Sequence, residues 1–123
     1  MPLGLMPLEI EEQEYRPGVL LIRLAGRVML GPESERIERI VEQALERGVR
    51  DFIFDLSGVT HIDSTGIGRF IASFNRVRRA AGKMHMVAAP GAVRDGFRVT
   101  RLDTVFPFYS DVESAAAGLG PTG

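Results

Sequence analysis

The chain has 123 residues, of which 45% are hydrophobic and 25% charged, and its formal net charge at pH 7 is −1. This composition is typical of a folded domain with one hydrophobic core, and it argues against a disordered chain or a nucleic-acid-binding protein. The absence of cysteine excludes disulfides, thiolate metal sites and cysteine nucleophiles. With only 2 histidines as further metal ligands, neither a metal site nor a cofactor is expected.

The N-terminus is apolar but does not have the pattern of a signal peptide. Residues 1–8 contain two prolines, lack a basic start and are followed at once by glutamates. No later apolar run approaches the roughly 18 residues that cross a bilayer. We therefore expect a cytoplasmic protein that is not inserted in a membrane.

The first half of the chain predicts a hairpin, a helix and a buried strand. Residues 8–15 and 19–24 form the hairpin, because Pro17-Gly18 between them favours a turn. A helix is expected from Pro32 to Gly48, since its apolar residues recur at helical spacing. Residues 51–56 then form a short buried strand, which Ser57-Gly58 is expected to break.

The second half alternates helices and strands. A helix is expected from Asp63 to Gly82, with an apolar stripe of Ile67, Phe70, Ile71, Phe74 and Val77. It is followed by a buried strand at 84–89, a weaker helix at 92–102, an edge strand at 106–109 and a short helix that Asp111 caps, ending at 117.

The expected order is therefore β-β-α-β-α-β-α-β-α. Strands that alternate with helices indicate an α/β fold with a mixed, mostly parallel sheet of four or five strands, flanked by about four helices. No linker, repeat or low-complexity segment divides the chain. We expect one domain over residues 1–123, with an ordered core at about 8–119.

The most informative stretch runs from Asp63 to Gly68, where a buried strand turns into a helix. Asp63 and Ser64 are both favourable at a helix N-terminus. Gly66 and Gly68 are poor helix formers, so we interpret them as leaving the first turn bare for the close approach of a partner. An exposed serine at such a turn is a good phosphate acceptor, because a helix N-terminus tolerates negative charge.

The run Asp63-Ser64-Thr65-Gly66-Ile67-Gly68, after the strand that ends in Asp55-Leu56-Ser57, resembles the signature of STAS domains of the anti-sigma factor antagonist type. The element order matches that family over nearly the whole chain. The resemblance implies a bacterial regulator of sigma-factor-dependent transcription, not an enzyme. Ser64 stands where an anti-sigma factor serine kinase of the GHKL type phosphorylates the family, and a PP2C-type phosphatase reverses the modification.

We expect the partner to contact the residues of this motif and the arginine that follows it. They are Asp63, Ser64, Thr65, Gly66, Ile67, Gly68 and Arg69. One position departs from the family pattern: Met29, in the stretch Gly26-Arg27-Val28-Met29, stands where an aspartate is usual. That loop lies near the switch serine in the family, so the departure leaves open an alternative, a non-phosphorylated STAS scaffold that docks on a transporter ATPase or in a multi-STAS complex.

Two further alternatives concern individual residues. A hydrolase would use Ser64 as a nucleophile, but Ile62 occupies the first glycine position of the Gly-x-Ser-x-Gly elbow, and His61 lies too close in sequence for a triad. Between Ser64 and Arg94 the charged residues are all basic. We interpret them as a solvated face balanced by acidic neighbours, although Arg69 and Arg76 are also candidates to dock an acidic partner or the phosphates of a kinase-bound nucleotide.

Overall fold

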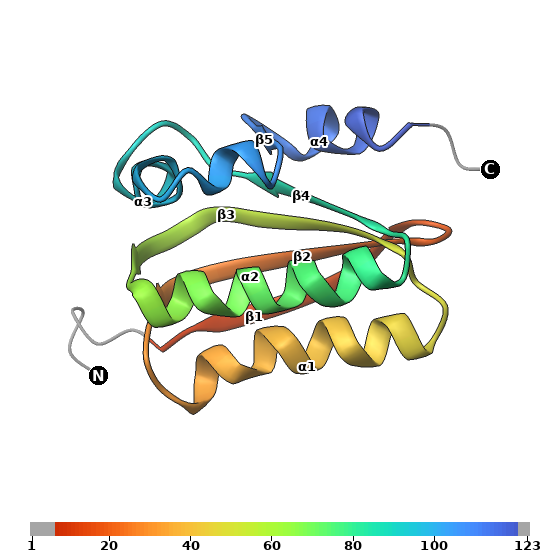
Figure 1. Ribbon diagram of the computed structural model, residues 1–123, viewed down its shortest axis with the longest axis horizontal. Helices are drawn as coiled ribbons and strands as arrows, with labels where there is room; N and C mark the ends of the chain where they lie inside the picture. Colours follow the sequence, from red (N-terminus) through yellow and green to blue (C-terminus); the bar gives the residue numbers. More distant parts are fainter. Residues whose placement is uncertain (1–6, 121–123) are drawn as a thin grey trace.

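The computed structural model describes residues 7–120, so the apolar start at 1–6 and the end at 121–123 lie outside the described residues. Among these residues, one sheet of five strands forms the centre of the molecule, with the strands side by side in chain order (Figure 1). The strands are β1 (Glu9–Arg16), β2 (Val19–Val28), β3 (Asp51–Ile62), β4 (Lys83–Val87) and β5 (Phe108–Tyr109). β1 pairs antiparallel with β2, and all later neighbours are parallel, which confirms the mixed, mostly parallel sheet.

In the described part of the chain, four helices cover the two faces of this sheet. They are α1 (Pro32–Glu46), α2 (Ser64–Arg79), α3 (Ala92–Val99) and α4 (Val112–Gly118). Because parallel strands that are neighbours in sequence are joined by right-handed crossovers, α1, α2 and α3 all pack on one face. α4 packs on the other face.

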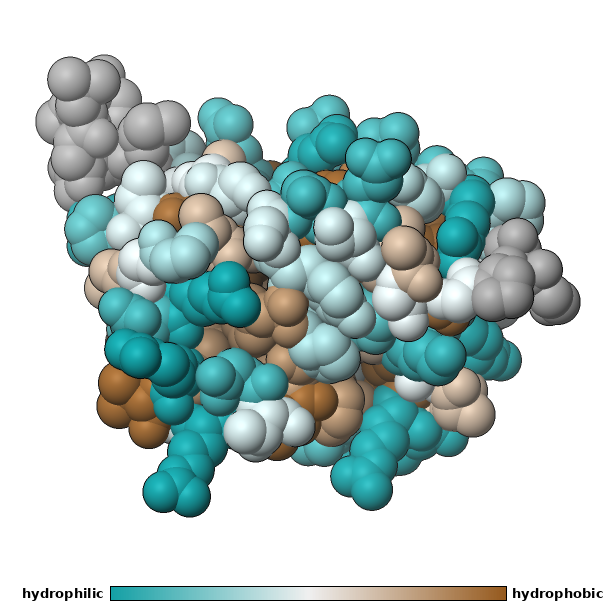
Figure 2. All heavy atoms as spheres, turned by 90° about the horizontal axis from the view of Figure 1, so that it is seen from above, coloured by the Kyte–Doolittle hydropathy of each residue, from teal (hydrophilic) through white to brown (hydrophobic). Residues whose placement is uncertain are grey.

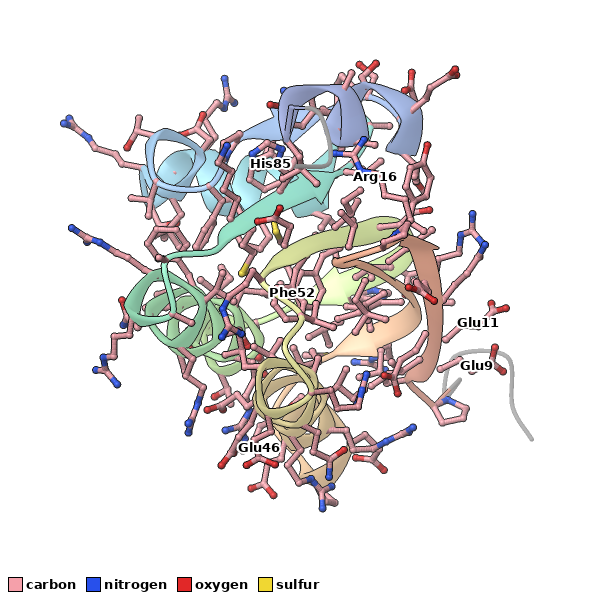
Figure 3. All side chains as sticks on the ribbon, turned by 90° about the vertical axis from the view of Figure 1, so that its right-hand side faces the viewer. Glu9, Glu11, Arg16, Glu46, Phe52 and His85 are labelled. Carbon is pink, nitrogen blue, oxygen red and sulfur yellow. The ribbon has the colours of Figure 1, made fainter. Side chains whose placement is uncertain are left out.

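The main core lies between the sheet and the first three helices. Fully buried Phe52 and Phe54 of β3 belong to it, and Phe54 makes an edge-to-face contact with Phe70 of α2, with ring centroids 5.4 Å apart. Phe97 of α3 packs on Phe70 in turn. Figure 3 shows Phe52 at the centre of the molecule, among the elements that it joins. A smaller core under α4 includes Leu21, Ile53, Ala115 and Leu119.

The side of the molecule on which α3 and α4 both reach the surface is mostly hydrophilic. Figure 2 shows hydrophobic side chains only in small groups on this face, mainly in its lower half. Val99 in α3 and Val105 after it are among the exposed large hydrophobic residues, at 79% and 44% of their accessible surface. Single exposed side chains of this kind are normal on a folded domain.

Strand β3 corrects one expectation, because it continues through Ser57-Gly58 to Ile62 instead of breaking. The pairing register with β2 shifts where Gly58 lies opposite Ala25, so the strand has an irregularity and not an end. A Cβ atom at Gly58 would lie 2.9 Å from the Ala25 side chain. The glycine is therefore explained by the close approach of β2, and not by a turn.

Smaller differences concern the ends of elements. The helix expected to reach residue 102 ends at Val99, and Leu102–Thr104 forms a separate 3-10 turn after Arg101, whose φ is 61°. Ile71, expected in the buried stripe of α2, is 38% exposed. The last strand is confined to Phe108–Tyr109, and Phe106 before it is a buried core residue.

Candidate functional site

The candidate site lies where β3 passes into α2. The carboxyl ends of β2, β3 and β4 lie at the same end of the sheet, so the helices that follow them begin there together (Figure 1). This is the end at which open α/β sheets usually place their binding sites. The β2–α1 loop of residues 29–31 and the first turn of α2 are neighbours at this end.

Asp63 is the N-cap of α2. Its backbone is extended, with φ −110° and ψ −179°, and its Oδ1 accepts a hydrogen bond of 2.7 Å from the Gly66 N–H. Its backbone carbonyl accepts from the Ile67 N–H at 2.9 Å, which begins the helix. A capping carboxylate of this kind satisfies backbone donors that the helix leaves free.

The same carboxylate also reaches a second element. Its Oδ2 accepts from the Leu30 N–H of the β2–α1 loop at 3.0 Å, and the Asp63 N–H donates to the Val28 carbonyl at 3.3 Å. Partial desolvation acts to raise the pKa of Asp63, but N–H donors led by Gly66 and Leu30 outweigh it and lower the pKa below its ordinary value of 3.8. The side chain is therefore an anion that holds donors from two segments.

Ser64 is the first residue of α2 and not its N-cap, although Asp63 and Ser64 are both residue types that favour the N-cap position. The side chain is exposed, and within residues 7–120 its hydroxyl has no hydrogen-bond partner. The hydroxyl is therefore free to react or to be covered by another molecule. Thr65, the next residue, is partly buried.

Gly66 and Gly68 differ, contrary to the expectation that both leave the turn bare for a partner. Gly66 is buried, and a Cβ atom there would lie 2.1 Å from the Val28 carbonyl oxygen, so it is this chain's own strand β2 that makes the close approach. A Cβ atom at Gly68 would meet no atom within 4 Å from other parts of residues 7–120. Only Gly68 therefore leaves open space beside the first turn.

Ile67 and Arg69 both make contacts with other residues of this domain. Ile67 packs against the main core and lies beside Gly96 of α3. Arg69 donates from Nε to the Ser34 hydroxyl at 3.2 Å and from a terminal nitrogen to Glu38 at 3.1 Å. Arg76 pairs with Glu42 at 3.8 Å, so acidic side chains of α1 balance both arginines, as the solvated-face interpretation expected.

Met29 and Leu30 lie in the loop beside this turn. The Met29 sulfur accepts a hydrogen bond from Arg27 Nε at 3.3 Å, and the Leu30 side chain is 78% exposed. An open groove runs past the loop, lined by Pro7, Leu8, Arg27, Met29, Leu30, Glu33 and Asp63. The contact of Leu30 with Asp63 was not visible in the sequence, because the two residues are 33 positions apart.

Neither histidine is paired with Ser64. The Nδ1 atom of His61 lies 2.9 Å from the Thr60 hydroxyl, and His85 is buried in β4, where its Nδ1 donates to the Ala115 carbonyl at 3.0 Å. Over the described part of the chain, no group of three or more His, Asp or Glu side chains could hold a metal ion. Among the same residues no helix has the length and apolar character needed to cross a membrane.

Comparison with known protein families identifies the family to which this chain belongs. The model of the STAS domain matches residues 12–115, a stretch that begins within β1 and ends within α4. The chain belongs to the STAS domain family. The motif at residues 63–68 therefore lies inside the matched region, at the strand-to-helix turn.

Two bacterial proteins that this STAS domain is similar to are named as anti-sigma factor antagonists. The anti-sigma F factor antagonist of Paenibacillus polymyxa is 24% identical over 115 residues, which are 93% of this chain and 97% of that protein. The crystal structure of an anti-sigma factor antagonist from Mycobacterium paratuberculosis has a TM-score of 0.78 at 20% identity, covering 93% of this chain and 95% of that one. These relatives are named for regulation and not for catalysis.

A third likeness is to the Bacillus cell fate determinant SpoIIAA in its phosphorylated form. Its TM-score is 0.71 at 17% identity, and the match covers 89% of this chain and 99% of that one. These structural likenesses confirm the α/β fold expected from the sequence.

Proposed function

We propose that this STAS domain is an anti-sigma factor antagonist that binds an anti-sigma factor and is switched off by phosphorylation of Ser64. The observation that carries the proposal is the Ser64 hydroxyl at the first position of α2, which is exposed and has no hydrogen-bond partner among residues 7–120. Support comes from the family, whose relatives are named as anti-sigma factor antagonists. The partner we propose is a serine kinase of the GHKL type, and a PP2C-type phosphatase reverses the modification.

The surface around Ser64 explains how one phosphoryl group would control binding. Residues 64–68 carry no charge, and the neighbouring carboxylate of Asp63 is occupied by N–H donors. A phosphoryl group adds about two negative charges to this neutral turn. The helix N-terminus tolerates the added charge, but a partner surface that fits a neutral serine would have to desolvate and repel it.

The open space at Gly68 is consistent with a closely fitting partner. Outside its own helix backbone and neighbouring residues, no atom of the described residues lies within 4 Å of a Cβ position there, so a partner's backbone can approach the helix. Phosphorylation next to such a contact needs a coupling of only about 1–3 kcal/mol to weaken binding by roughly 5- to 150-fold.

Binding of Ser64 variants to GHKL-type anti-sigma factors from the source genome tests the proposal. We expect Ser64→Ala to bind one of them as tightly as the wild type and to escape phosphorylation, while Ser64→Glu binds at least about tenfold more weakly. Ser110→Glu is the matched control, because it adds the same charge at an exposed serine outside the site. Equal affinity of Ser64→Ala and Ser64→Glu would overturn the switch.

A further inference from the structure

Asp63 connects the first turn of α2 to the β2–α1 loop. Its two carboxylate oxygens accept from different segments: Oδ1 from Gly66 N–H at 2.7 Å and Oδ2 from Leu30 N–H at 3.0 Å. The backbone adds a third link, from the Asp63 N–H to the Val28 carbonyl. The loop and the helix start are thus held together by one side chain and its own peptide group.

Two other hydrogen bonds hold this loop, one on the Gly31 carbonyl and one on the Met29 sulfur, but neither involves Leu30. The Leu30 side chain is 78% exposed, so its position does not come from packing in the core. The backbone N–H of Leu30 is exposed to solvent on the same loop, and Asp63 is its acceptor. The orientation of Leu30 therefore depends on where the Asp63 carboxylate lies.

Ser64 directly follows Asp63. A phosphoryl group on Ser64 would place acceptor oxygens beside the same first-turn N–H donors that Asp63 uses, and its charge would repel the carboxylate. Since the two carboxylate oxygens move together, a shift at Oδ1 also changes the bond from Oδ2 to Leu30.

We propose that Asp63 is a positioning residue that transmits a charge at Ser64 to the β2–α1 loop and so alters the presentation of Leu30. The regulatory meaning of this link depends on the function proposed above, but the link itself is a property of the isolated domain. Phosphorylation would then change two segments of the partner-facing end, and not the serine alone.

Backbone amide hydrogen exchange, followed by NMR on the full chain, tests the link. In Asp63→Asn the amide oxygen can still cap Gly66, but the –NH₂ group cannot accept from Leu30. We expect the Leu30 amide to exchange about tenfold faster in this variant, while α2 stays folded. Asp111→Asn is the matched control, since Asp111 caps α4 through the Ser114 N–H at 2.7 Å and makes no bond to the loop.

The effect of Ser64 on Leu30 is the second readout. Ser64→Glu, and the protein with phosphoserine incorporated at position 64, should each speed exchange of the Leu30 amide by at least about threefold. In the Asp63→Asn background the same change at Ser64 should have no further effect, because the connecting carboxylate is gone. If Asp63 were only a structural cap, the effects of Asp63→Asn and Ser64→Glu on the exchange rate of the Leu30 amide would be additive. Additive effects would overturn the proposal.

The outcomes separate this inference from the proposed function. If Ser64→Glu weakens partner binding but leaves Leu30 exchange unchanged, the proposed function stands and the link through Asp63 is wrong. If Leu30 exchange changes as expected while no anti-sigma factor distinguishes Ser64→Ala from Ser64→Glu, the link stands and the proposed function is wrong.

Discussion

Gly66 and Gly68 stand two positions apart in α2 but have different surroundings. The site of a Cβ at Gly66 is 2.1 Å from a backbone oxygen of β2, and at Gly68 it is open. We expect Gly66→Ala to lower the free energy of unfolding by about 1–3 kcal/mol, because the backbone must shift to make room. Gly68→Ala should raise it by up to about 1 kcal/mol, since alanine is the better helix former.

Urea unfolding followed by circular dichroism measures both glycine variants. The interpretation of Gly66 as a packing residue fails if the two alanine variants have the same midpoint and slope. If Gly68 is also a partner contact, Gly68→Ala should weaken partner binding despite its greater stability.

His85 makes the stability of the domain depend on pH. It is 6% exposed, its ring stacks on Tyr109 with centroids 5.1 Å apart, and Figure 3 shows it beneath α4. Burial lowers the pKa of His85 below its ordinary value of 6.5, more than the bond to Ala115 raises it. As the pH falls through about 6.5, the His85 side chain therefore binds more protons in the unfolded chain than in the folded one.

The sign of this effect gives a prediction. The contribution of neutral His85 to the free energy of unfolding is fully present above the pKa that this residue has in the unfolded chain. It is lost as the pH falls through 6.5 toward the lower pKa of His85 in the folded protein. We expect the Tm to fall between pH 7.5 and about pH 5.5, and His85→Phe, which keeps an aromatic ring against Tyr109, to flatten that slope. A wild-type Tm that is constant over this range would contradict the assignment.

At the scale of elements, Arg69 joins α2 to α1. Its side chain is 21% exposed and bonds both the buried Ser34 and Glu38, whereas Arg76 is 41% exposed and lies 3.8 Å from Glu42. Charged hydrogen bonds that are partly buried contribute more than exposed ion pairs.

Two substitutions test this difference. We expect Arg69→Ala to lower the free energy of unfolding by about 1.5–3 kcal/mol, and Arg76→Ala by less than about 1 kcal/mol. Denaturant unfolding of both variants measures the values. If the two variants lose the same free energy of unfolding, the ion pair of Arg69 stabilises the fold no more than an exposed pair does. That result would favour a role for Arg69 in partner contact alone.

The elements also show what local sequence can predict. The hairpin, α1 and the cap at Asp111 were predicted correctly, because turn residues, periodicity and capping side chains act over a few positions. The break at Ser57-Gly58 was wrong, since the pairing with β2 overrides the turn preference of two residues. For the same reason the role of Gly66 was missed: its close neighbour, Val28, comes from another strand.

At the scale of the whole molecule, the edge of the sheet at β1 differs in charge from the end of the sheet where the parallel strands finish. β1 is an edge strand whose glutamates face solvent, and Figure 3 shows Glu9 and Glu11 directed away from the core. Such charges discourage pairing between sheet edges. The carboxyl ends of the parallel strands instead carry the neutral turn at Ser64 and the exposed Leu30, which makes that end the candidate binding surface.

The motif at residues 63–68 was identified from the sequence, but its three-dimensional connections were not. Residue types and their order indicated a helix start with an accessible serine, and the structure places Ser64 there. The contacts of Asp63 with Leu30 and of Arg69 with Ser34 join residues more than thirty positions apart. Such contacts depend on how the crossovers bring helix starts together, and a single sequence does not encode them locally.

Intact mass of the protein purified from its own cells, with peptide mapping of any modification, tests the assignment of Ser64 most directly. The cells are sampled during growth and under stress. We predict that the mass of one phosphoryl group is present in some conditions and absent in others, and that it maps to Ser64. A protein that stays unmodified in every condition, or that carries its phosphoryl group at another residue, would contradict the account.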